Sequence, residues 1–330
     1  MKIGELQMND TYGRKIEYLR ISVTDKCNLR CKYCMPPGGV KTIPHEEILR
    51  LEEIYRLTNI MAGLGINKVR LTGGEPTVRK NITELVRSIG GIPQIHTIAM
   101  TTNGVRLPNL LPELVESGLT NLNISIDTLN PDKYREITGF DRFHDVMTGI
   151  DMAYEAGIKI KLNCVPCRGF NDKDLIQLAE IACKKDIDVR FIELMPIGRG
   201  RLFTGIPSKE ILDSLEQRFG KASKIANIGE GPAEYYVFNG FKGRVGFISP
   251  ISHKFCAQCN RLRLTSEGRL KLCLYYKDGV DLRELLRNGA SDIEIQNVIK
   301  KAIMKKPKEH FFGEQNTDNT EIKRMNQIGG

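Results

Sequence analysis

The chain has 330 residues, 41% of them hydrophobic and 27% charged, a composition that is typical of a folded globular protein and argues against disorder. Its formal net charge of +9 suits an anionic partner, such as a phosphorylated small molecule, a nucleic acid or a membrane surface. The N-terminus lacks the apolar run of a signal peptide, and no segment approaches the ~18 apolar residues of a membrane span. We therefore expect a cytoplasmic protein without a membrane contact.

From about residue 16 to 193, short apolar runs alternate with helix-like stretches, which indicates repeated βα units and a parallel sheet. The predicted strands are 18–23, 68–71, 97–101, 121–126, 159–165 and 189–194. The predicted helices include 45–64, 81–89, 110–117 and 172–184. Six strands are too few for a closed eight-stranded barrel, so we predict an α/β fold, an incomplete (βα)6 TIM-like barrel.

After about Pro196 the pattern changes. Glycines interrupt it, a helix is predicted over 208–219, and a β-like stretch follows over 235–248. We therefore divide the chain into a partial barrel (1–196), a smaller C-terminal α+β region (197–312) and a polar tail (313–330). The tail shows no apolar pattern that would let it pack, so we expect it to be flexible.

Two groups among the nine cysteines have the tight spacing of metal sites rather than of loop-closing disulfides. The first group, Cys27, Cys31 and Cys34, forms a CxxxCxxC loop after the first predicted strand. Three thiolates so placed can ligate three irons of a 4Fe-4S cluster and leave the fourth iron open for catalysis. The alternative is a tetrahedral zinc site, which needs a fourth ligand, and His45 is the only close histidine.

A Thr-Gly-Gly-Glu-Pro turn, residues 72–76, follows the second predicted strand, and its paired glycines would let the backbone approach a ligand. The cysteine loop, the aromatic Tyr33 before its last cysteine, and this turn together resemble the radical S-adenosylmethionine enzymes. In that superfamily a reduced cluster cleaves S-adenosylmethionine and releases a 5'-deoxyadenosyl radical. The resemblance implies contacts of the cofactor with Tyr33, Gly74, Glu75, Ser125 and Met195.

The second cysteine group lies in the C-terminal region and consists of Cys256, Cys259 and Cys273. Its three thiolates suggest another 4Fe-4S cluster with one open iron. From spacing alone, zinc or a structural knuckle is an equal alternative. The residues between the cysteines add two guanidinium groups, Arg261 and Arg263, whose forked donors suit a bidentate grip on phosphate.

Residues 255–273 read FCAQCNRLRLTSEGRLKLC, and the sequence ends in Gly329-Gly330. These features resemble the GTP 3',8-cyclases that begin molybdenum cofactor biosynthesis. The resemblance implies that the second cluster binds the purine of GTP, that the radical removes hydrogen from ribose C3', and that the sugar radical attacks C8. The product would be 3',8-cyclo-7,8-dihydroguanosine triphosphate.

The same resemblance assigns residues to the substrate. The implied GTP contacts are Arg20, Arg70, Thr101, Lys161, Arg190, Arg261, Leu262 and Arg263, and the implied catalytic residues are Arg20, Gly329 and Gly330. Apart from the resemblance, four of these cations lie in predicted barrel strands, where an unpaired buried charge is costly. A triphosphate would supply the missing negative charge, although a structural ion pair could do so for any one of them.

Partners follow from the same resemblance: a reductant such as flavodoxin or ferredoxin, and a downstream cyclic pyranopterin monophosphate synthase. A homodimer is one option for the assembly. We expect no nucleic-acid partner, because the densest basic stretch, 300–308, is interpreted as a solvated helix face.

Two other functions are compatible with part of the pattern. A radical S-adenosylmethionine enzyme that modifies a peptide through an auxiliary cluster usually has more C-terminal cysteines than this chain. An iron-sulfur RNA-binding protein would leave the Gly-Gly-Glu-Pro turn unexplained. The remaining cysteines, Cys164, Cys167 and Cys183, are interpreted as structural.

Overall fold

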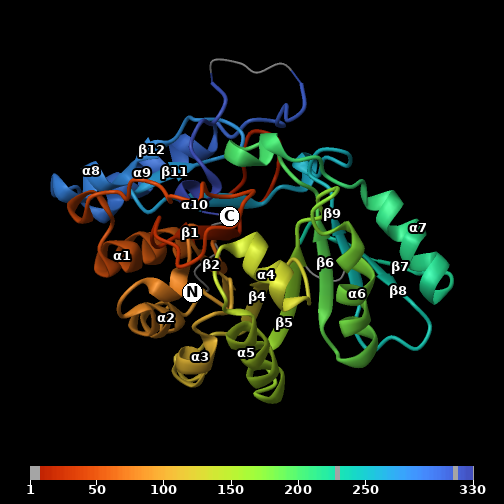
Figure 1. Cartoon of the computed structure of the whole chain (residues 1–330). Helices are drawn as coiled ribbons and strands as arrows, with labels where there is room; N and C mark the ends of the chain where they lie inside the picture. Colours follow the sequence, from red (N-terminus) through yellow and green to blue (C-terminus); the bar gives the residue numbers. More distant parts are fainter. Residues whose placement is uncertain (1–7, 227–230, 315–318, 330) are drawn as a thin grey trace.

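The computed structural model describes residues 8–226, 231–314 and 319–329. Six neighbouring parallel strands form the centre of its sheet, in the order of the sequence (Figure 1). These strands are β1 (Tyr18–Ser22), β2 (Lys68–Thr72), β3 (Thr97–Thr102), β4 (Asn121–Ser125), β5 (Lys159–Cys164) and β6 (Asp188–Ile192). The predicted six-stranded partial barrel is confirmed, and every strand ends within two residues of its predicted bounds.

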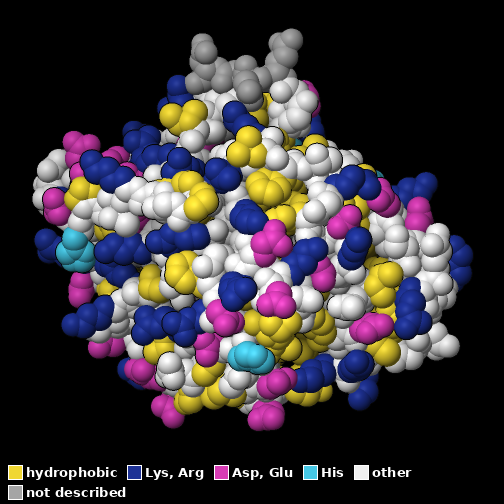
Figure 2. All heavy atoms as spheres, viewed as in Figure 1, with side chains coloured by type: hydrophobic (Ala, Val, Ile, Leu, Met, Phe, Trp, Pro, Cys, Tyr) yellow, Lys and Arg dark blue, Asp and Glu magenta, His cyan; other side chains and the backbone are white. Residues whose placement is uncertain are grey.

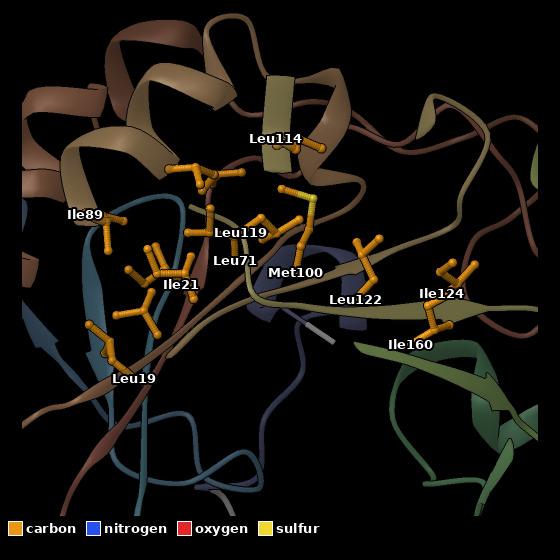
Figure 3. Close-up of a cluster of buried hydrophobic side chains, with 14 of the residues drawn as sticks. Leu19, Ile21, Leu71, Ile89, Met100, Leu114, Leu119, Leu122, Ile124 and Ile160 are labelled. Carbon is orange, nitrogen blue, oxygen red and sulfur yellow. The ribbon is translucent and has the colours of Figure 1, made fainter. Parts of the chain in front are cut away.

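Helices cover the outer face of these strands. They are α1 (Leu51–Ala62), α2 (Ile82–Gly90), α3 (Leu107–Glu116), α4 (Pro131–Thr138), α5 (Phe143–Glu155) and α6 (Leu175–Lys184). Figure 3 shows the core between the two layers, where Met100 and Leu122 from the strands meet Ile89 and Leu114 from the helices. Since side chains alternate along a strand, the residues between these apolar ones face the interior of the barrel.

The predicted helix 45–64 is interrupted. A 3-10 turn, His45–Glu47, is followed by extended backbone at Ile48, and α1 begins only at Leu51. Ile48 and Leu49 are buried, and the backbone N–H of Leu49 donates to the carbonyl of Ser266, so this segment packs on the C-terminal region. That tertiary contact overrides the helical pattern of the sequence.

The C-terminal region extends the same sheet at both edges. Strand β9 (Val245–Ile248) pairs in parallel with β6, and β10 (Arg261–Leu264) pairs in parallel with β1. The outer strands are β7 (Ser223–Ile225), β8 (Glu234–Val237), β11 (Arg269–Lys271) and β12 (Val280–Asp281), and the helices are α7 (Ser208–Phe219), α8 (Leu282–Arg287) and α9 (Asp292–Ile303). The sheet is continuous across the proposed boundary at 196, so the division into domains stays a prediction.

The tail differs from the flexible segment that we expected. Its described residues, 319–329, include a short helix α10 (Met325–Ile328), and Ile328 is buried against Tyr275 and Phe312. Glu321, also buried, pairs with the buried Lys271. The expectation was wrong for these residues because a few isolated contacts, rather than an apolar repeat, hold them in place.

None of the helices within the described residues is long and apolar enough to cross a membrane. Lys and Arg side chains are spread over the face shown in Figure 2, where Asp and Glu side chains lie among them.

Replacing Leu122 by alanine should lower the free energy of unfolding by about 2–5 kcal/mol, because the side chain is fully buried between β4 and the helices. Urea denaturation would measure the change. The control is Leu202→Ala, whose side chain is 69% exposed and should change stability by about 0.5 kcal/mol or less. Equal effects of the two substitutions would contradict this account of the core.

Candidate active site

The interior of the barrel opens into a cavity of about 770 Å³ that collects nearly all the residues predicted for the site. Those lining it are Cys27, Cys31, Cys34, Cys256, Cys259, Cys273, Arg20, Tyr33, Arg70, Gly74, Glu75, Thr101, Ser125, Lys161, Arg190, Met195, Arg261 and Arg263. The two cysteine groups, far apart in the sequence, thus face one space. Such convergence at the C-terminal ends of parallel strands is where barrel enzymes carry their chemistry.

The glycines of the turn after β2 have a role that we did not predict. The backbone N–H groups of Gly74 and Glu75 donate to the carbonyls of Thr24 and Lys26, at 2.7 and 2.8 Å. A Cβ atom on Gly74 would lie 2.6 Å from the carbonyl oxygen of Asp25 and closer still to that of Lys26. The missing side chain therefore makes room for protein backbone directly before Cys27, rather than only for a ligand.

Glu75 holds this turn through its buried carboxylate. One oxygen accepts hydrogen bonds from Thr77 and from the Thr102 hydroxyl, and the other accepts one from the backbone N–H of Asn103 at 2.6 Å. Burial raises the pKa of Glu75, and these donors oppose the rise. The side chain of Asn103 in turn donates to Asn28 in the cysteine loop, at 2.8 Å. Glu75 is therefore a ligand candidate that also joins β2, β3 and the loop.

Tyr33 is fixed by a residue that sequence reasoning missed. Its hydroxyl donates to the carboxylate of Asp127 at 2.7 Å, and Asp127 also accepts from the backbone N–H of Val165 at 2.9 Å. Burial raises the pKa of both Tyr33 and Asp127. Asp127 follows β4 by two residues, a position at the catalytic end of the barrel that could have marked it.

The cationic residues form an ordered row across the sheet. Arg263, Arg20 and Arg70 lie opposite one another on β10, β1 and β2. Adjacent strands are ~4.8 Å apart, so the three side chains leave the same face of the sheet side by side. Burial lowers the pKa of Arg20, and burial together with Arg261 lowers that of Arg263 to about 10.

Several cations around the cavity have no carboxylate partner among the described residues. Across residues 8–226, 231–314 and 319–329, we find no carboxylate ion pair for Arg70, Arg190, Arg261 or Arg263. Arg190 is held instead by the side-chain oxygen of Asn163, at 2.6 and 2.9 Å. Buried cations without counter-ions are costly, so the cavity suits a polyanionic ligand.

Two titratable groups border the row. The Tyr18 hydroxyl accepts hydrogen bonds from Arg70 and, at 3.4 Å, from Arg20. Burial raises the pKa of Tyr18, but these two cations outweigh it and bring the value to about 7. Lys161 donates to the Tyr235 hydroxyl at 3.0 Å, and burial together with Arg190 lowers its pKa to about 8.

Two buried cations brace the second cysteine loop. Arg14, paired with Asp10, donates to the carbonyl of Cys256 at 2.9 Å. Lys306 is 3% exposed and donates to the carbonyls of Arg261 and Leu272. We interpreted 300–308 as a solvated face, and this is wrong for Lys306, because the chain turns inward after α9.

The cysteine groups suit iron-sulfur clusters. Within the ranges that the structure describes, no three His, Cys, Asp or Glu side chains come close enough to hold a single metal ion. In a four-iron cube each thiolate binds a different iron, so its ligands stand further apart. All six thiols are unpaired and half-buried and line one cavity, and they fit two such clusters.

Three predicted residues need separate comment. Gly329 lies at the ends of β1 and β2, where its carbonyl accepts a hydrogen bond from Arg263. Gly330 lies outside the described residues. Leu262 is fully buried in the hydrophobic core, so its side chain does not reach the cavity and only its backbone could contact a ligand.

The cysteines interpreted as structural do not line the cavity. Cys164 and Cys167 are buried at the end of β5, and Cys183 is half-buried in α6. The side chain of Asn171 donates to the Cys164 sulfur and accepts from the backbone of Cys167, which closes this segment on itself.

Comparison with known proteins gives matches along the whole chain. The profile of the radical SAM superfamily matches residues 21–182, and that of Molybdenum Cofactor Synthesis C matches residues 187–312. GTP 3',8-cyclases of Clostridium perfringens and Desulforamulus reducens are 46% and 47% identical, each over 98% of this chain and 100% of the relative.

The fold has solved counterparts as well. Streptococcus suis SuiB bound to S-adenosylmethionine superposes with a TM-score of 0.58 at 16% identity, over 91% of this chain and 74% of SuiB. This likeness concerns the fold alone. The identity to the cyclases extends over both cysteine groups and the region between them. The chain therefore belongs to the GTP 3',8-cyclase family of radical SAM proteins.

Proposed function

We propose that this protein cyclises GTP between C3' of the ribose and C8 of the purine, to give 3',8-cyclo-7,8-dihydroguanosine triphosphate for molybdenum cofactor synthesis. The observation that carries the proposal is one cavity, in which two groups of three cysteines face several arginines, of which Arg70, Arg190, Arg261 and Arg263 have no carboxylate partner among the described residues. Full-length identity to curated cyclases supports it.

The first cysteine loop would form the cofactor end of the cavity. Cys27, Cys31 and Cys34 would hold a 4Fe-4S cluster, which supplies the electron for reductive cleavage of S-adenosylmethionine. The protein positions the cofactor against this loop through Gly74 and Glu75, with Tyr33, Ser125 and Met195 on the surrounding wall. Tyr33 is fixed by Asp127, so its ring presents a rigid surface to the cofactor.

The opposite end would bind the substrate. We propose that Arg263, Arg20 and Arg70 bind the triphosphate, joined by Lys161, Arg190 and Arg261, because these cations line one cavity and most of them have no carboxylate partner among the described residues. Thr101 and the backbone of Leu262 complete the proposed contacts. Cys256, Cys259 and Cys273 would hold the second cluster near the purine, and Arg20 and the terminal glycines would act closest to the reacting sugar.

Two protein partners are proposed on the strength of the family resemblance. The reductive step needs an electron, for which we propose flavodoxin or ferredoxin. The cyclised nucleotide would pass to a cyclic pyranopterin monophosphate synthase. A homodimer stays an expectation from the sequence.

The peptide-modifying alternative shares the fold, since SuiB has also been solved with its precursor peptide SuiA. It does not account for the row of buried and half-buried arginines in the cavity, which calls for a polyanion rather than a peptide. Identity of 46% to cyclases, against 16% to SuiB, favours the nucleotide substrate.

The deciding experiment incubates the anaerobically reconstituted, reduced protein with S-adenosylmethionine, with and without GTP. We expect 5'-deoxyadenosine to accumulate together with a cyclised nucleotide, both identified by mass spectrometry. Cleavage of the cofactor without conversion of GTP would contradict the cyclase assignment and favour the peptide-modifying alternative.

Affinity for GTP should fall as the pH rises from 7 to 9. Above about 7 the Tyr18 hydroxyl gains a negative charge, and above about 8 Lys161 loses its positive charge, so both changes weaken attraction to the triphosphate. Equilibrium dialysis of labelled GTP would measure the effect. Tyr18→Phe should remove the lower step and Lys161→Arg the upper one, whereas an affinity that is constant from pH 6.5 to 9 would contradict both assignments.

A further inference from the structure

Asn326, in the tail, combines burial, a fixed orientation and an unsatisfied atom. Its side chain is 2% exposed and lines the cavity. Its Nδ2 donates to the backbone carbonyl of Asp25 at 3.1 Å. A carbonyl can only accept, so this contact decides which end of the amide is the nitrogen. The other end, Oδ1, is buried and has no hydrogen-bond partner among residues 8–226, 231–314 and 319–329.

A buried carbonyl oxygen is rarely left without a hydrogen bond. It loses its hydrogen bond to water on burial, and without a new donor this desolvation lowers the stability of the protein. An apolar side chain at position 326 would avoid this desolvation cost. An amide that is tied down at one end and unsatisfied at the other, on the wall of a ligand cavity, is therefore best explained by a donor on the ligand.

The surroundings of Asn326 identify the end of the cavity. Asp25 precedes Cys27 by two residues, and the backbone of Asn326 makes a hydrogen bond to the sulfur of Cys34. Asn326 thus lies against the first cysteine loop, at the end that we assign to S-adenosylmethionine. Gly329, three residues later, reaches Arg263 at the substrate end.

We propose that Asn326 is a positioning residue for the cofactor: Oδ1 accepts a hydrogen bond from an N–H or O–H donor of S-adenosylmethionine, while Nδ2 anchors the tail to the cysteine loop. The cofactor offers such donors in its methionyl ammonium and its ribose hydroxyls, and a charged donor makes the stronger bond. This inference rests on the cofactor assignment made under the proposed function.

The tail would then form a wall common to both ligands. Asn326, in α10, would meet the cofactor, and Gly329, directly after α10, contacts Arg263 of the row. Cofactor binding should consequently slow the opening of residues 319–329, before any substrate is added.

The experiment measures the dissociation constant of labelled S-adenosylmethionine by equilibrium dialysis, with reconstituted protein of equal iron content. Asn326→Ala should bind about tenfold more weakly, as expected for one lost hydrogen bond to a charged donor. Asn326→Asp keeps an acceptor but, like alanine, loses the donor to the Asp25 carbonyl, so it should recover only part of the affinity. The control is Ile322→Ala, a tail side chain that is 85% exposed, which should bind as wild type does.

Wild-type affinity in Asn326→Ala would overturn the proposal, and equally weak binding by the alanine and aspartate variants would overturn the acceptor role. A second readout needs no variant: hydrogen exchange of residues 319–329 in the wild-type protein should slow when the cofactor is added, and unchanged exchange would contradict the proposal. If the wild-type protein does not bind S-adenosylmethionine at all, the proposed function itself fails.

Discussion

Gly74→Ala should lose the first iron-sulfur cluster and keep the second. The new Cβ would overlap the backbone carbonyls of Asp25 and Lys26, and backbone cannot swing aside as a flexible side chain can. Cys27 directly follows Lys26, so the cysteine loop would have to shift. Iron content should fall from about eight to about four atoms per chain, and cofactor cleavage should fall to background. Iron and sulfide analysis, with electron paramagnetic resonance of the reduced protein, would measure the loss.

The matched control is Gly38→Ala, four residues after Cys34, where an added Cβ meets nothing within 4 Å. It should retain about eight irons. Wild-type iron content and wild-type activity in Gly74→Ala would show that packing of this turn does not determine the position of the cysteine loop. Loss of both clusters with a lowered melting temperature would point to general unfolding instead, again against the local account.

Arg263→Ala should lower kcat/KM for GTP by about 100-fold while 5'-deoxyadenosine still forms. Arg263 is half-buried beside Arg20 and donates to the carbonyl of Gly329, so its removal takes away one cation of the row and one contact that holds the tail. Arg263→Lys should restore only part of the rate, because lysine keeps the charge but not the forked donors. Product assays with and without GTP would separate cyclisation from cofactor cleavage.

Arg269→Ala serves as the control for this prediction. Arg269 lies on the neighbouring strand β11, does not line the cavity, and donates to the carbonyl of Gly279 at 3.2 Å. Its removal should leave kcat/KM nearly unchanged. If Arg263→Ala cyclised GTP as well as this control, the row of arginines would not be the triphosphate site.

The sequence predicts the barrel well because each of its strands has a recognisable local pattern. Apolar residues such as Leu122 and Ile124 alternate with polar ones that line the cavity, and helices follow at regular intervals. The outer strands carry no such signal. Strands β11 and β12 have only three and two residues, too few for a pattern. Strand β10 pairs with β1 from the other end of the chain, and the local sequence gives no indication of such a pairing.

Site residues were predictable where the residue type itself carries the chemistry. The cysteines and the strand arginines stand out in this way. Asp127, Asn103 and Asn326 act through partners that are distant in the sequence, and Lys306 lies within a run of lysines that otherwise face solvent. Contact of Gly74 with the cofactor stays a prediction, and its packing against the backbone of residues 24–26 could not be foreseen, because those atoms meet the turn only in the folded chain.

The pairing of β1 with β10 has a consequence for synthesis on the ribosome. Strand β1 emerges early, but its neighbour at Arg261 follows roughly 240 residues later, which at ~5–20 residues per second is a delay of roughly 12 to 50 s. During that time β1 presents an open edge that other strands can join. A chain that stops near residue 196 would keep the edges of both β1 and β6 open, and should accumulate as aggregate rather than as a working half-enzyme.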